Sequence, residues 1–370
     1  MKIVFIGGRD IHLIGGIESY MANISTELNK LGHEIIVYCE SNRNETVMWN
    51  GVKVIHQKSI KSHFLCKPWL SLKATIRTIM NEKGVSIIHY NAWPPSLWCW
   101  LANLFGIKTL MQGHGLEWQR SKYSPKQQKI MKFMEKITAY MNRNLIMCSD
   151  GQTKYFWETY RRKAVTIPTA VILPKEKEET NSEVLQKYNL EKKKYFLFMG
   201  RLVQDKNPDY LIRAYKKCKD YGYKLVIAGS GIGGKKYVES LHELASDTEN
   251  IIFTGAVHGA DKDSLLRNAY AFCIPSTIEG LSIVLLEAMS YKLPVIASNI
   301  DANIELLGED AVYVRPENVD DLTTAINYCM ENPDAINRYC TTNFNKVTNN
   351  YTWDKVAKKY IEYLHNIGAE

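Results

Sequence analysis

The chain of 370 residues contains no long hydrophobic run. No stretch reaches the roughly 18 consecutive apolar residues that a membrane-spanning helix needs. The apolar start at residues 3–6 stops at Gly7-Gly8, which is too short for the apolar part of a secretory signal. These absences predict a protein that works in the cytoplasm.

The cysteines do not indicate a disulfide framework. The eight cysteines are scattered, with no C-x-x-C pair and no histidine at zinc-finger spacing. The sequence therefore predicts neither disulfides nor a structural metal site. What is present is an ordinary globular composition, with 45% hydrophobic and 23% charged residues, which excludes a disordered or fibrous chain. The length predicts two domains.

Charge is divided unevenly between the two halves. Residues 1–170 carry a net charge of +12, and residues 171–370 carry −4. Two segments of the first half, 53–77 and 120–143, are strongly basic, and the second also repeats apolar residues at helical spacing. This pattern predicts either a helix on an anionic membrane surface or a core-facing helix with solvated lysines. Nucleic acid is not expected as a partner, because no nucleic-acid motif accompanies the charge.

Strand-like and helical patterns alternate along the whole chain. Strands are predicted at 2–6, 34–39, 86–90, 109–112, 195–199, 224–228, 251–254, 271–274 and 295–297, with helices between them. The fold class is therefore α/β, with two doubly wound parallel-sheet (Rossmann-like) domains facing a central cleft. The predicted boundaries are 1–172 for an N-terminal domain, 173–194 for a polar linker, 195–350 for a C-terminal domain and 351–370 for a last helix.

The most informative segment follows the predicted strand 271–274. Glu279 and Glu287 stand there with seven residues between them. Gly280, Leu281 and Ser282 are predicted to open a helix, whose first N–H groups would bind a diphosphate. Glu287 would accept hydrogen bonds from ribose hydroxyls, and Glu279 from hydroxyls of a transferred group.

This segment resembles the E-x7-E motif of glycosyltransferase family 4, whose members are retaining sugar-nucleotide transferases with the GT-B fold. Other family motifs follow in order. Gly15 and Gly16 resemble the early glycine motif beside the donor phosphates, and Arg201 and Lys206, after the strand 195–199, resemble the two cations that grip the diphosphate. The resemblance implies that these residues bind the donor and that Arg201, Lys206 and Glu279 are catalytic.

His114 lies between two glycines, directly after the predicted strand 109–112. The family resemblance implies that His114 is catalytic and faces the donor sugar. The wider string from His114 to Arg120 resembles a narrower group that includes bacterial rhamnosyltransferases of surface polysaccharides. Glu117, Trp118 and Arg120 would then shape the acceptor or sugar site, or anchor the loop.

Two other motifs point to different chemistry. Gly229, Gly231 and Gly234 satisfy G-x-G-x-x-G after a predicted strand, which keeps an NAD-type oxidoreductase as an alternative. No acidic residue ends the next strand, so this match is weak. The D-x-D at Asp261 and Asp263 is predicted to cap a helix that begins near Ser264 rather than to bind a metal. No metal and no cofactor are expected.

The combined prediction is a retaining glycosyltransferase of bacterial surface polysaccharide (O antigen or capsule) synthesis. It would move a sugar, first L-rhamnose from a deoxythymidine diphosphate donor and second a uridine-linked sugar, to a lipid-linked glycan. The basic N-terminal domain would hold the enzyme on the inner face of the cell membrane as a peripheral protein. A non-catalytic membrane-docking subunit is the remaining alternative.

Overall fold

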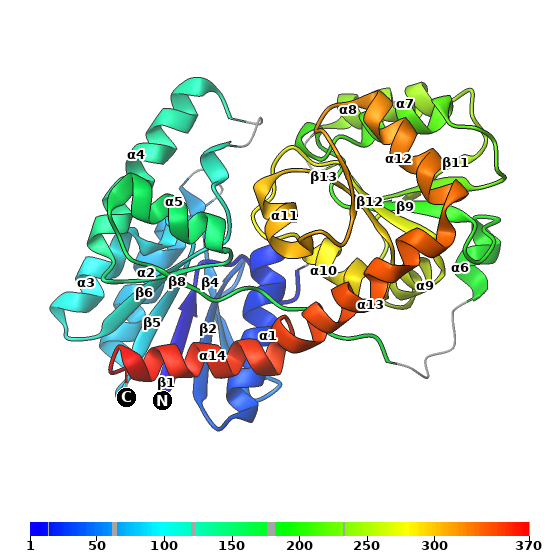
Figure 1. Cartoon of the computed structure of the whole chain (residues 1–370). Coiled ribbons are helices and arrows are strands. Elements are labelled where there is room, and N and C mark those ends of the chain that lie inside the picture. Colours follow the sequence, from blue (N-terminus) through cyan, green and yellow to red (C-terminus); the bar gives the residue numbers. More distant parts are fainter. Residues whose placement is uncertain (14, 61–64, 120–122, 176–181, 232–233, 370) are drawn as a thin grey trace. The chain divides into compact units, whose positions relative to one another are not determined.

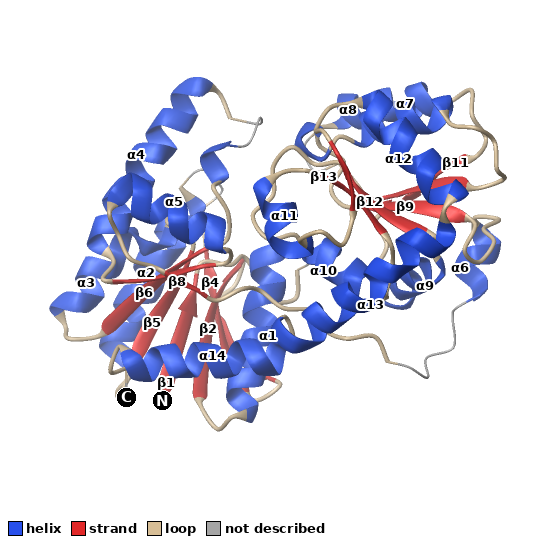
Figure 2. Cartoon of the chain, viewed as in Figure 1, coloured by secondary structure: helices blue, strands red, loops and turns tan. Residues whose placement is uncertain are grey.

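The structure is a computed structural model that describes residues 1–370 except 14, 61–64, 120–122, 176–181, 232–233 and 370 (Figure 1). The chain divides into two compact units. The first unit comprises residues 1–170 together with 353–370, and the second comprises 171–352. In each unit helices cover both faces of a largely parallel sheet (Figure 2), which confirms the prediction of two doubly wound α/β domains.

The first unit contains an eight-stranded sheet with the order β3-β4-β2-β1-β5-β6-β7-β8. Its strands are β1 Lys2–Ile6, β2 Glu34–Ser41, β3 Glu45–Trp49, β4 Val52–Lys58, β5 Ile87–Asn91, β6 Lys108–Gly113, β7 Asn144–Met147 and β8 Val165–Thr166. All neighbours pair in parallel except β3 and β4, which form an antiparallel edge. Its helices are α1 Gly16–Lys30, α2 Cys66–Asn81, α3 Cys99–Leu104, α4 Pro125–Met141, α5 Asp150–Tyr160 and α14 Trp353–Asn366, with short 3-10 turns at Pro95–Trp98 and Glu117–Gln119.

Alternation along β1 explains the two layers of this unit. Ile3 and Phe5 point into one core, and Val4 and Ile6 point into the core on the other face. A strand with both faces buried must be apolar throughout, because successive side chains point to opposite faces. The apolar sequence of β1 therefore specifies a central strand with helices on both sides.

The last helix of the chain completes the first core. Trp353 and Tyr360 of α14 are buried together with residues of α1 and β1. The Tyr360 hydroxyl also lies 2.8 Å from His89 Nδ1 on β5. The C-terminal helix thus belongs to the first unit, although the sequence left its partner open.

The second unit contains a six-stranded, wholly parallel sheet with the order β11-β10-β9-β12-β13-β14. Its strands are β9 Tyr195–Met199, β10 Lys224–Ala228, β11 Ile251–Gly255, β12 Ala271–Ile274, β13 Val295–Ser298 and β14 Val312–Val314. Its helices are α6 Ser182–Lys187, α7 Pro208–Lys217, α8 Lys235–Ala245, α9 Gly259–Asn268, α10 Ile283–Ser290, α11 Asp301–Leu307, α12 Val319–Glu331 and α13 Pro333–Asn350, with a 3-10 turn at Gln204–Lys206.

The structure differs from the predicted boundaries in the segment 173–194. Its described part includes α6, and Val184, Leu185 and Leu190 are buried in the core of the second unit. The charged residues of this segment led to the prediction of a polar linker. Three buried apolar side chains are nevertheless enough to attach a short helix to a core. The segment is therefore part of the second unit rather than a free linker.

Candidate functional site

The edge of the second sheet where the chain changes direction holds most of the predicted site. From β9 the chain moves to β10 and β11 on one side, and later returns to β12 on the other side. Such a switch point separates the two loops that follow the neighbouring strands, and ligands of doubly wound sheets bind there. Here the loops are 200–207 after β9 and 275–282 after β12.

Hydrogen bonds join these two loops directly. The backbone N–H of Thr277 donates to the Asp205 carbonyl at 3.0 Å. The Asn207 side-chain amide donates to the Pro275 carbonyl at 2.9 Å. Because Asn207 is buried, its amide needs such a partner. The loops therefore form one structure, although about 70 residues separate them in the sequence.

Lys206 and Glu279 meet across the two loops. The Lys206 ammonium forms an ion pair with the Glu279 carboxylate. Ser276 Oγ donates a second hydrogen bond to the same carboxylate oxygen at 2.8 Å. The Glu279 side chain is only 7% exposed, so this carboxylate does not point into solvent. The structure thus brings together two of the predicted catalytic residues.

Helix α10 begins later than the sequence suggested. Gly280 and Leu281 belong to the loop, Ser282 is the N-cap, and the helix runs from Ile283. The first bond inside the helix runs from Leu286 N–H to the Ser282 carbonyl at 3.1 Å. The N–H groups of the first turn therefore have no acceptor within the helix, which is the property that lets a helix start bind an anion.

Glu287 pairs with a lysine that the sequence did not single out. Its carboxylate lies 2.8 Å from Lys262 Nζ on α9, and its side chain is 19% exposed. Lys262 is the middle residue of the D-x-D string, and α9 begins at Gly259. The capping interpretation of Asp261 and Asp263 was therefore wrong, because both aspartates lie inside the helix rather than before it.

The remaining residues of this edge lie on the loops after β9 and β10. Arg201 is exposed and directly follows Gly200. Gly200 approaches Gly229 so closely that a Cβ atom at Gly229 would overlap the Gly200 carbonyl. The first glycine of the G-x-G-x-x-G string is thus required by loop packing, and residues 232–233 of this string lie outside the described residues.

At the corresponding edge of the first sheet, Gly7, Asn91 and His114 lie at or after the ends of β1, β5 and β6, and the loop after β1 also carries the charged Arg9 and Asp10. Its switch point lies between β1 and β5, the neighbours that carry Gly7 and Asn91 at or after their ends. Gly7 has a φ of +123°, and a Cβ atom there would lie 2.6 Å from the Asn91 carbonyl oxygen. His114, after β6, places its Nε2 3.1 Å from Asn91 Oδ1.

Both ring nitrogens of His114 face protein atoms. The Asn91 amide nitrogen donates to the Ile6 carbonyl, so its Oδ1 faces His114 and accepts from Nε2–H. His114 Nδ1 lies 3.6 Å from Cys148 Sγ. Burial, helped by the charge of Lys67, lowers the pKa of His114 to about 3. The imidazole is therefore neutral at neutral pH and anchors its loop to the end of β5.

The predicted glycine motif lies at the start of α1. Gly15 is the N-cap and Gly16 is the first helical residue. The first turn carries a buried acid that sequence reasoning missed, Glu18, which accepts from Arg9 Nε and from the Arg9 backbone N–H, both at 3.2 Å. Burial pushes the pKa of Glu18 upward, but hydrogen bonds from its own backbone and from Arg9 hold it below its usual value.

The loop after His114 is anchored rather than open. Glu117 accepts from the Tyr123 hydroxyl at 3.1 Å. The Trp118 ring packs on Tyr155, and Lys132 Nζ lies 4.6 Å from its centre. These contacts support the loop-anchoring alternative for Glu117 and Trp118, whereas Arg120 lies outside the described residues.

Helix α4 exposes the apolar residues that a core-facing helix would bury. Its buried face consists of Met131, Glu135, Thr138 and Ala139. Ile130 and Phe133 are 45% and 62% exposed. Four exposed lysines alternate with them, namely Lys126, Lys129, Lys132 and Lys136. The outer face of α4 is therefore both apolar and cationic, as an interfacial helix requires.

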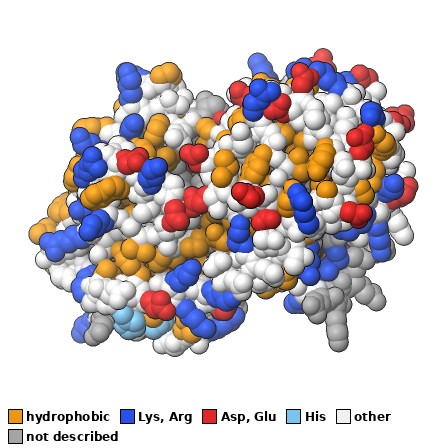
Figure 3. Space-filling model, viewed as in Figure 1, with side chains coloured by type: hydrophobic (Ala, Val, Ile, Leu, Met, Phe, Trp, Pro, Cys, Tyr) orange, Lys and Arg blue, Asp and Glu red, His pale blue; other side chains and the backbone are white. Residues whose placement is uncertain are grey.

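A shallow hollow lies on this face of the first unit. It has a volume of about 290 Å³ and is lined by Lys129, Lys132, Phe133, Lys136, Thr159 and Tyr160. Figure 3 shows hydrophobic and basic side chains side by side over this unit. Helices α2 and α3 of the same unit add exposed Trp69, Met80, Trp100, Leu104 and Phe105. Among the described helices, none is long and apolar enough to cross a membrane.

Two protein families match the chain, one in each half. Residues 14–174 match the family described as Glycosyltransferase Family 4. Residues 180–346 match the family described as Glycosyl transferases group 1. The two matches together span nearly the whole chain and divide it close to the boundary between the two structural units.

Curated relatives carry glycosyltransferase names. The O-antigen chain mannosyltransferase RfbU of Salmonella typhimurium is 33% identical over 186 residues, which are 50% of each chain. An uncharacterized glycosyltransferase of Methanocaldococcus jannaschii is 33% identical over 48% of this chain and 46% of its own length. The match thus spans about half the length of each of these two relatives. A second uncharacterized glycosyltransferase of that organism is 24% identical over 94% of this chain and 95% of its own.

Solved structures share the fold over the full length. Sucrose-phosphate synthase from Thermosynechococcus elongatus superposes with a TM-score of 0.83 at 17% identity, covering 100% of this chain and 99% of that one. The Anabaena protein HepE, solved in complex with UDP-glucose, superposes with a TM-score of 0.80 at 16% identity, covering 99% of this chain and 100% of that one.

Proposed function

Because this chain belongs to the glycosyltransferases of family 4 with the GT-B fold, we propose that it is a retaining enzyme that transfers a sugar from a nucleoside diphosphate donor to a lipid-linked glycan. The observation that carries the proposal is the Lys206–Glu279 pair at the switch point of the second sheet. It places a fixed cation, an acid and a helix start at one edge, where a sugar diphosphate needs all three.

Binding of the donor would replace ion pairs within this edge by contacts with the donor. Its diphosphate would take Lys206 from Glu279, with Arg201 and the first turn of α10 adding further positive charge. The released Glu279 carboxylate would accept hydrogen bonds from sugar hydroxyls. Glu287 would accept from ribose hydroxyls once it leaves Lys262.

The transfer step follows from where charge develops. The bond between the anomeric carbon and the diphosphate oxygen breaks through a transition state of oxocarbenium character. The departing diphosphate gains negative charge, which Lys206 and Arg201 stabilise. The acceptor hydroxyl attacks the same face and gives its proton to the departing diphosphate oxygen. The new glycosidic bond therefore keeps the anomeric configuration, and no metal is needed for this charge.

Three classes of donor are proposed. Deoxythymidine diphosphate L-rhamnose stays the first prediction from the sequence, and uridine-linked sugars are second. The similarity to an O-antigen chain mannosyltransferase and to a GDP-mannose-dependent mannosyltransferase of Mycolicibacterium smegmatis supports mannose from guanosine diphosphate as a further donor to test. All three place a diphosphate at the edge already described, so the choice between them does not alter the roles of Lys206 and Glu279.

The acceptor side is proposed to be the first unit. The cationic and apolar outer face of α4, with the hollow beside it, suits the phosphate groups and acyl boundary of an anionic membrane. A lipid-linked glycan reaches its enzyme at such a surface. We therefore propose a cytoplasmic enzyme held peripherally on the inner face of the cell membrane.

Donor turnover tests the central proposal. The purified full-length chain is incubated with each of the three donors and with lipid-linked glycan extracts, and release of nucleoside diphosphate is measured. The product's anomeric configuration is then read by NMR coupling constants. Release with retained configuration is the expected result. Inverted configuration would contradict the retaining mechanism, and no release with any donor would contradict the assigned donor classes.

Vesicle flotation tests the membrane proposal separately. The wild-type chain is expected to float with vesicles that contain phosphatidylglycerol, to float less at high salt, and not to float with neutral phosphatidylcholine vesicles. Lys129→Glu combined with Phe133→Ser should abolish flotation. The matched control, Lys235→Glu combined with Lys236→Glu on α8, should not. Equal losses in both double variants would contradict a specific role for α4.

A further inference from the structure

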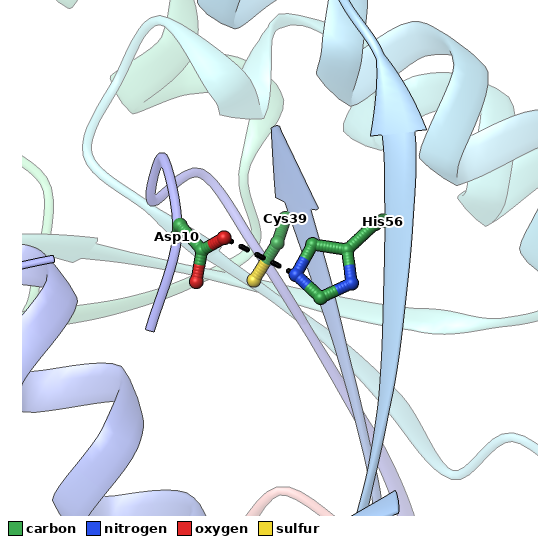
Figure 4. A group of neighbouring side chains, drawn as sticks. All are labelled: Asp10, Cys39 and His56. Carbon is green, nitrogen blue, oxygen red and sulfur yellow. Dashed lines mark hydrogen bonds and ion pairs between the residues drawn. The ribbon is translucent and has the colours of Figure 1, made fainter. Parts of the chain in front are cut away.

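Three side chains of the kinds that bind transition metals lie together in the first unit. They are Asp10 in the loop after β1, Cys39 on β2 and His56 on β4 (Figure 4). One ligand atom from each lies within 4.8 Å of the others. The cluster belongs to the first unit, whereas the Lys206–Glu279 pair belongs to the second.

Sheet register explains why the three residues meet. Cys39 and His56 are direct partners in the parallel pairing of β2 and β4, so their side chains share one face. The loop after β1 is attached to β2 by a hydrogen bond from the Glu40 backbone N–H to the Arg9 carbonyl. This bond brings the next residue, Asp10, over the same face.

The distances suit a small ion with nitrogen, sulfur and oxygen ligands. Asp10 Oδ2 lies 3.1 Å from His56 Nε2, with Cys39 Sγ beside them (Figure 4). In a tetrahedral zinc site the ligands bind at about 2.0–2.3 Å from the metal, which puts ligand atoms roughly 3.3–3.8 Å apart. Shifts of about 1 Å would therefore close the cluster around an ion, and zinc favours this mixture of ligands.

The outer side of His56 supplies an independent observation. His56 is buried, and its Nδ1 has no hydrogen-bond partner among the described residues. Glu45, its partner across β3 and β4, places a carboxylate oxygen 3.7 Å from that nitrogen. A metal-bound histidine commonly donates its other N–H to a carboxylate, which fixes the ring and raises its basicity. Glu45 is placed for that role.

We propose that Asp10, Cys39 and His56 form a Zn²⁺ site with three protein ligands and one open position for water. Binding releases the Cys39 proton to solvent and forms bonds from the metal to one sulfur, one nitrogen and one oxygen atom. The metal fixes the loop after β1 to β2 and β4. That loop also carries Arg9, which holds Glu18 in the first turn of α1, so the site stabilises the start of α1.

Cobalt substitution tests this proposal without any activity measurement. The full-length chain is stripped with a chelator and titrated with Co²⁺, which reports thiolate ligation through an intense near-ultraviolet charge-transfer band. We expect saturation at one equivalent, loss of the band when Zn²⁺ is added, and a higher melting temperature with Zn²⁺ than without it. Absence of the band in the wild-type chain would overturn the proposal.

Matched variants assign the ligands. Cys39→Ser should lose the charge-transfer band and the shift in melting temperature, whereas Cys99→Ser, which alters another buried thiol of the same unit, should keep both. Asp10→Asn changes a ligand whose side chain is 22% exposed and keeps its shape, so it remains informative if Cys39→Ser fails to fold. An unchanged cobalt spectrum and affinity in Asp10→Asn would contradict its role as a ligand and overturn the three-ligand site.

Discussion

The two units carry different side chains at the switch points of their sheets. In the second unit the switch point is charged, and the two acids of the E-x7-E motif already have lysine partners: Glu279 pairs with Lys206, and Glu287 with Lys262. In the first unit His114 is bonded to Asn91 beside Gly7, and the charged pair of Arg9 and Glu18 lies on the loop after β1 and the first turn of α1. In the proposed function the second unit binds the highly charged diphosphate, whereas the contacts of Gly7, Asn91 and His114 in the first unit maintain its packing.

Internal pairing has a physical reason in the charged edge. A mostly buried carboxylate without a partner would be costly, so the resting protein supplies a lysine. In the proposed function an incoming diphosphate, which carries more charge than the carboxylate, competes for the same ammonium.

Removing the central cation should have the largest effect. Lys206→Ala is expected to lower kcat by about 10²–10³, the usual loss when one group that stabilises transition-state charge is removed. Release of nucleoside diphosphate measures it. Lys216→Ala is the control, because Lys216 pairs with Asp247 on the same unit away from this edge, and its kcat should stay unchanged. If Lys206→Ala lowers kcat by less than about threefold, Lys206 does not stabilise the departing diphosphate as proposed.

The second acid should affect binding more than chemistry. Glu287→Ala is expected to weaken donor binding by about 1.5–3 kcal/mol, because the ribose loses a charged hydrogen-bond acceptor. Calorimetric titration with the nucleoside diphosphate measures it. Lys262→Met should not weaken binding, since Lys262 only occupies Glu287 in the resting state. If Lys262→Met weakens binding as much as Glu287→Ala, the two residues bind the donor together and the exchange model is wrong.

At the switch point of the first sheet, a substitution of Gly7 should lower stability through packing and backbone strain. Gly7→Ala is expected to destabilise the first unit by about 1–3 kcal/mol, because Ala disfavours the positive φ and its Cβ would meet Asn91. Urea unfolding followed by circular dichroism measures the change. Gly106→Ala also has a positive φ, of +75°, but open space around it, so its loss should be smaller. Equal losses would show that only the backbone conformation matters.

The last test concerns the dependence of stability on pH. Burial lowers the pKa of His114 to about 3, below the 6.5 of an unperturbed histidine. The unfolded chain therefore binds the extra proton between pH 6.5 and 3, and stability falls as pH falls through that window, by at most about 1.4 kcal/mol per pH unit. His114→Asn should flatten this dependence between pH 7 and 5. His365→Asn, at an exposed site, should not. Unfolding midpoints at each pH decide between them.

The sequence predicted those parts of the fold whose signal is local. β9, β10 and β12 have the predicted bounds, because a strand buried on both faces is a continuous apolar run. β4 was missed, since Lys53 and Lys58 made its segment resemble a basic surface stretch. The attachment of α14 to the first unit could not be predicted, because an amphipathic helix does not specify which core it covers.

The same distinction holds for the candidate sites. Glu279 and Glu287 were found because their spacing is a local motif. Lys262 was missed, since its contact with Glu287 depends on the packing of α9 against α10. The Asp10–Cys39–His56 cluster was missed for a related reason: its ligands lie on one loop and two strands, and one of those strands had not been recognised.

The position of α14 sets the order in which the two units can fold during synthesis. The first unit receives its last core residues only when residues 353–370 have left the ribosome, whereas the second unit is one continuous segment. During translation the surface that receives Trp353 and Tyr360 stays uncovered while the second unit can already fold. A nascent chain stalled before residue 353 should therefore hold a protease-resistant second unit beside a protease-sensitive first one.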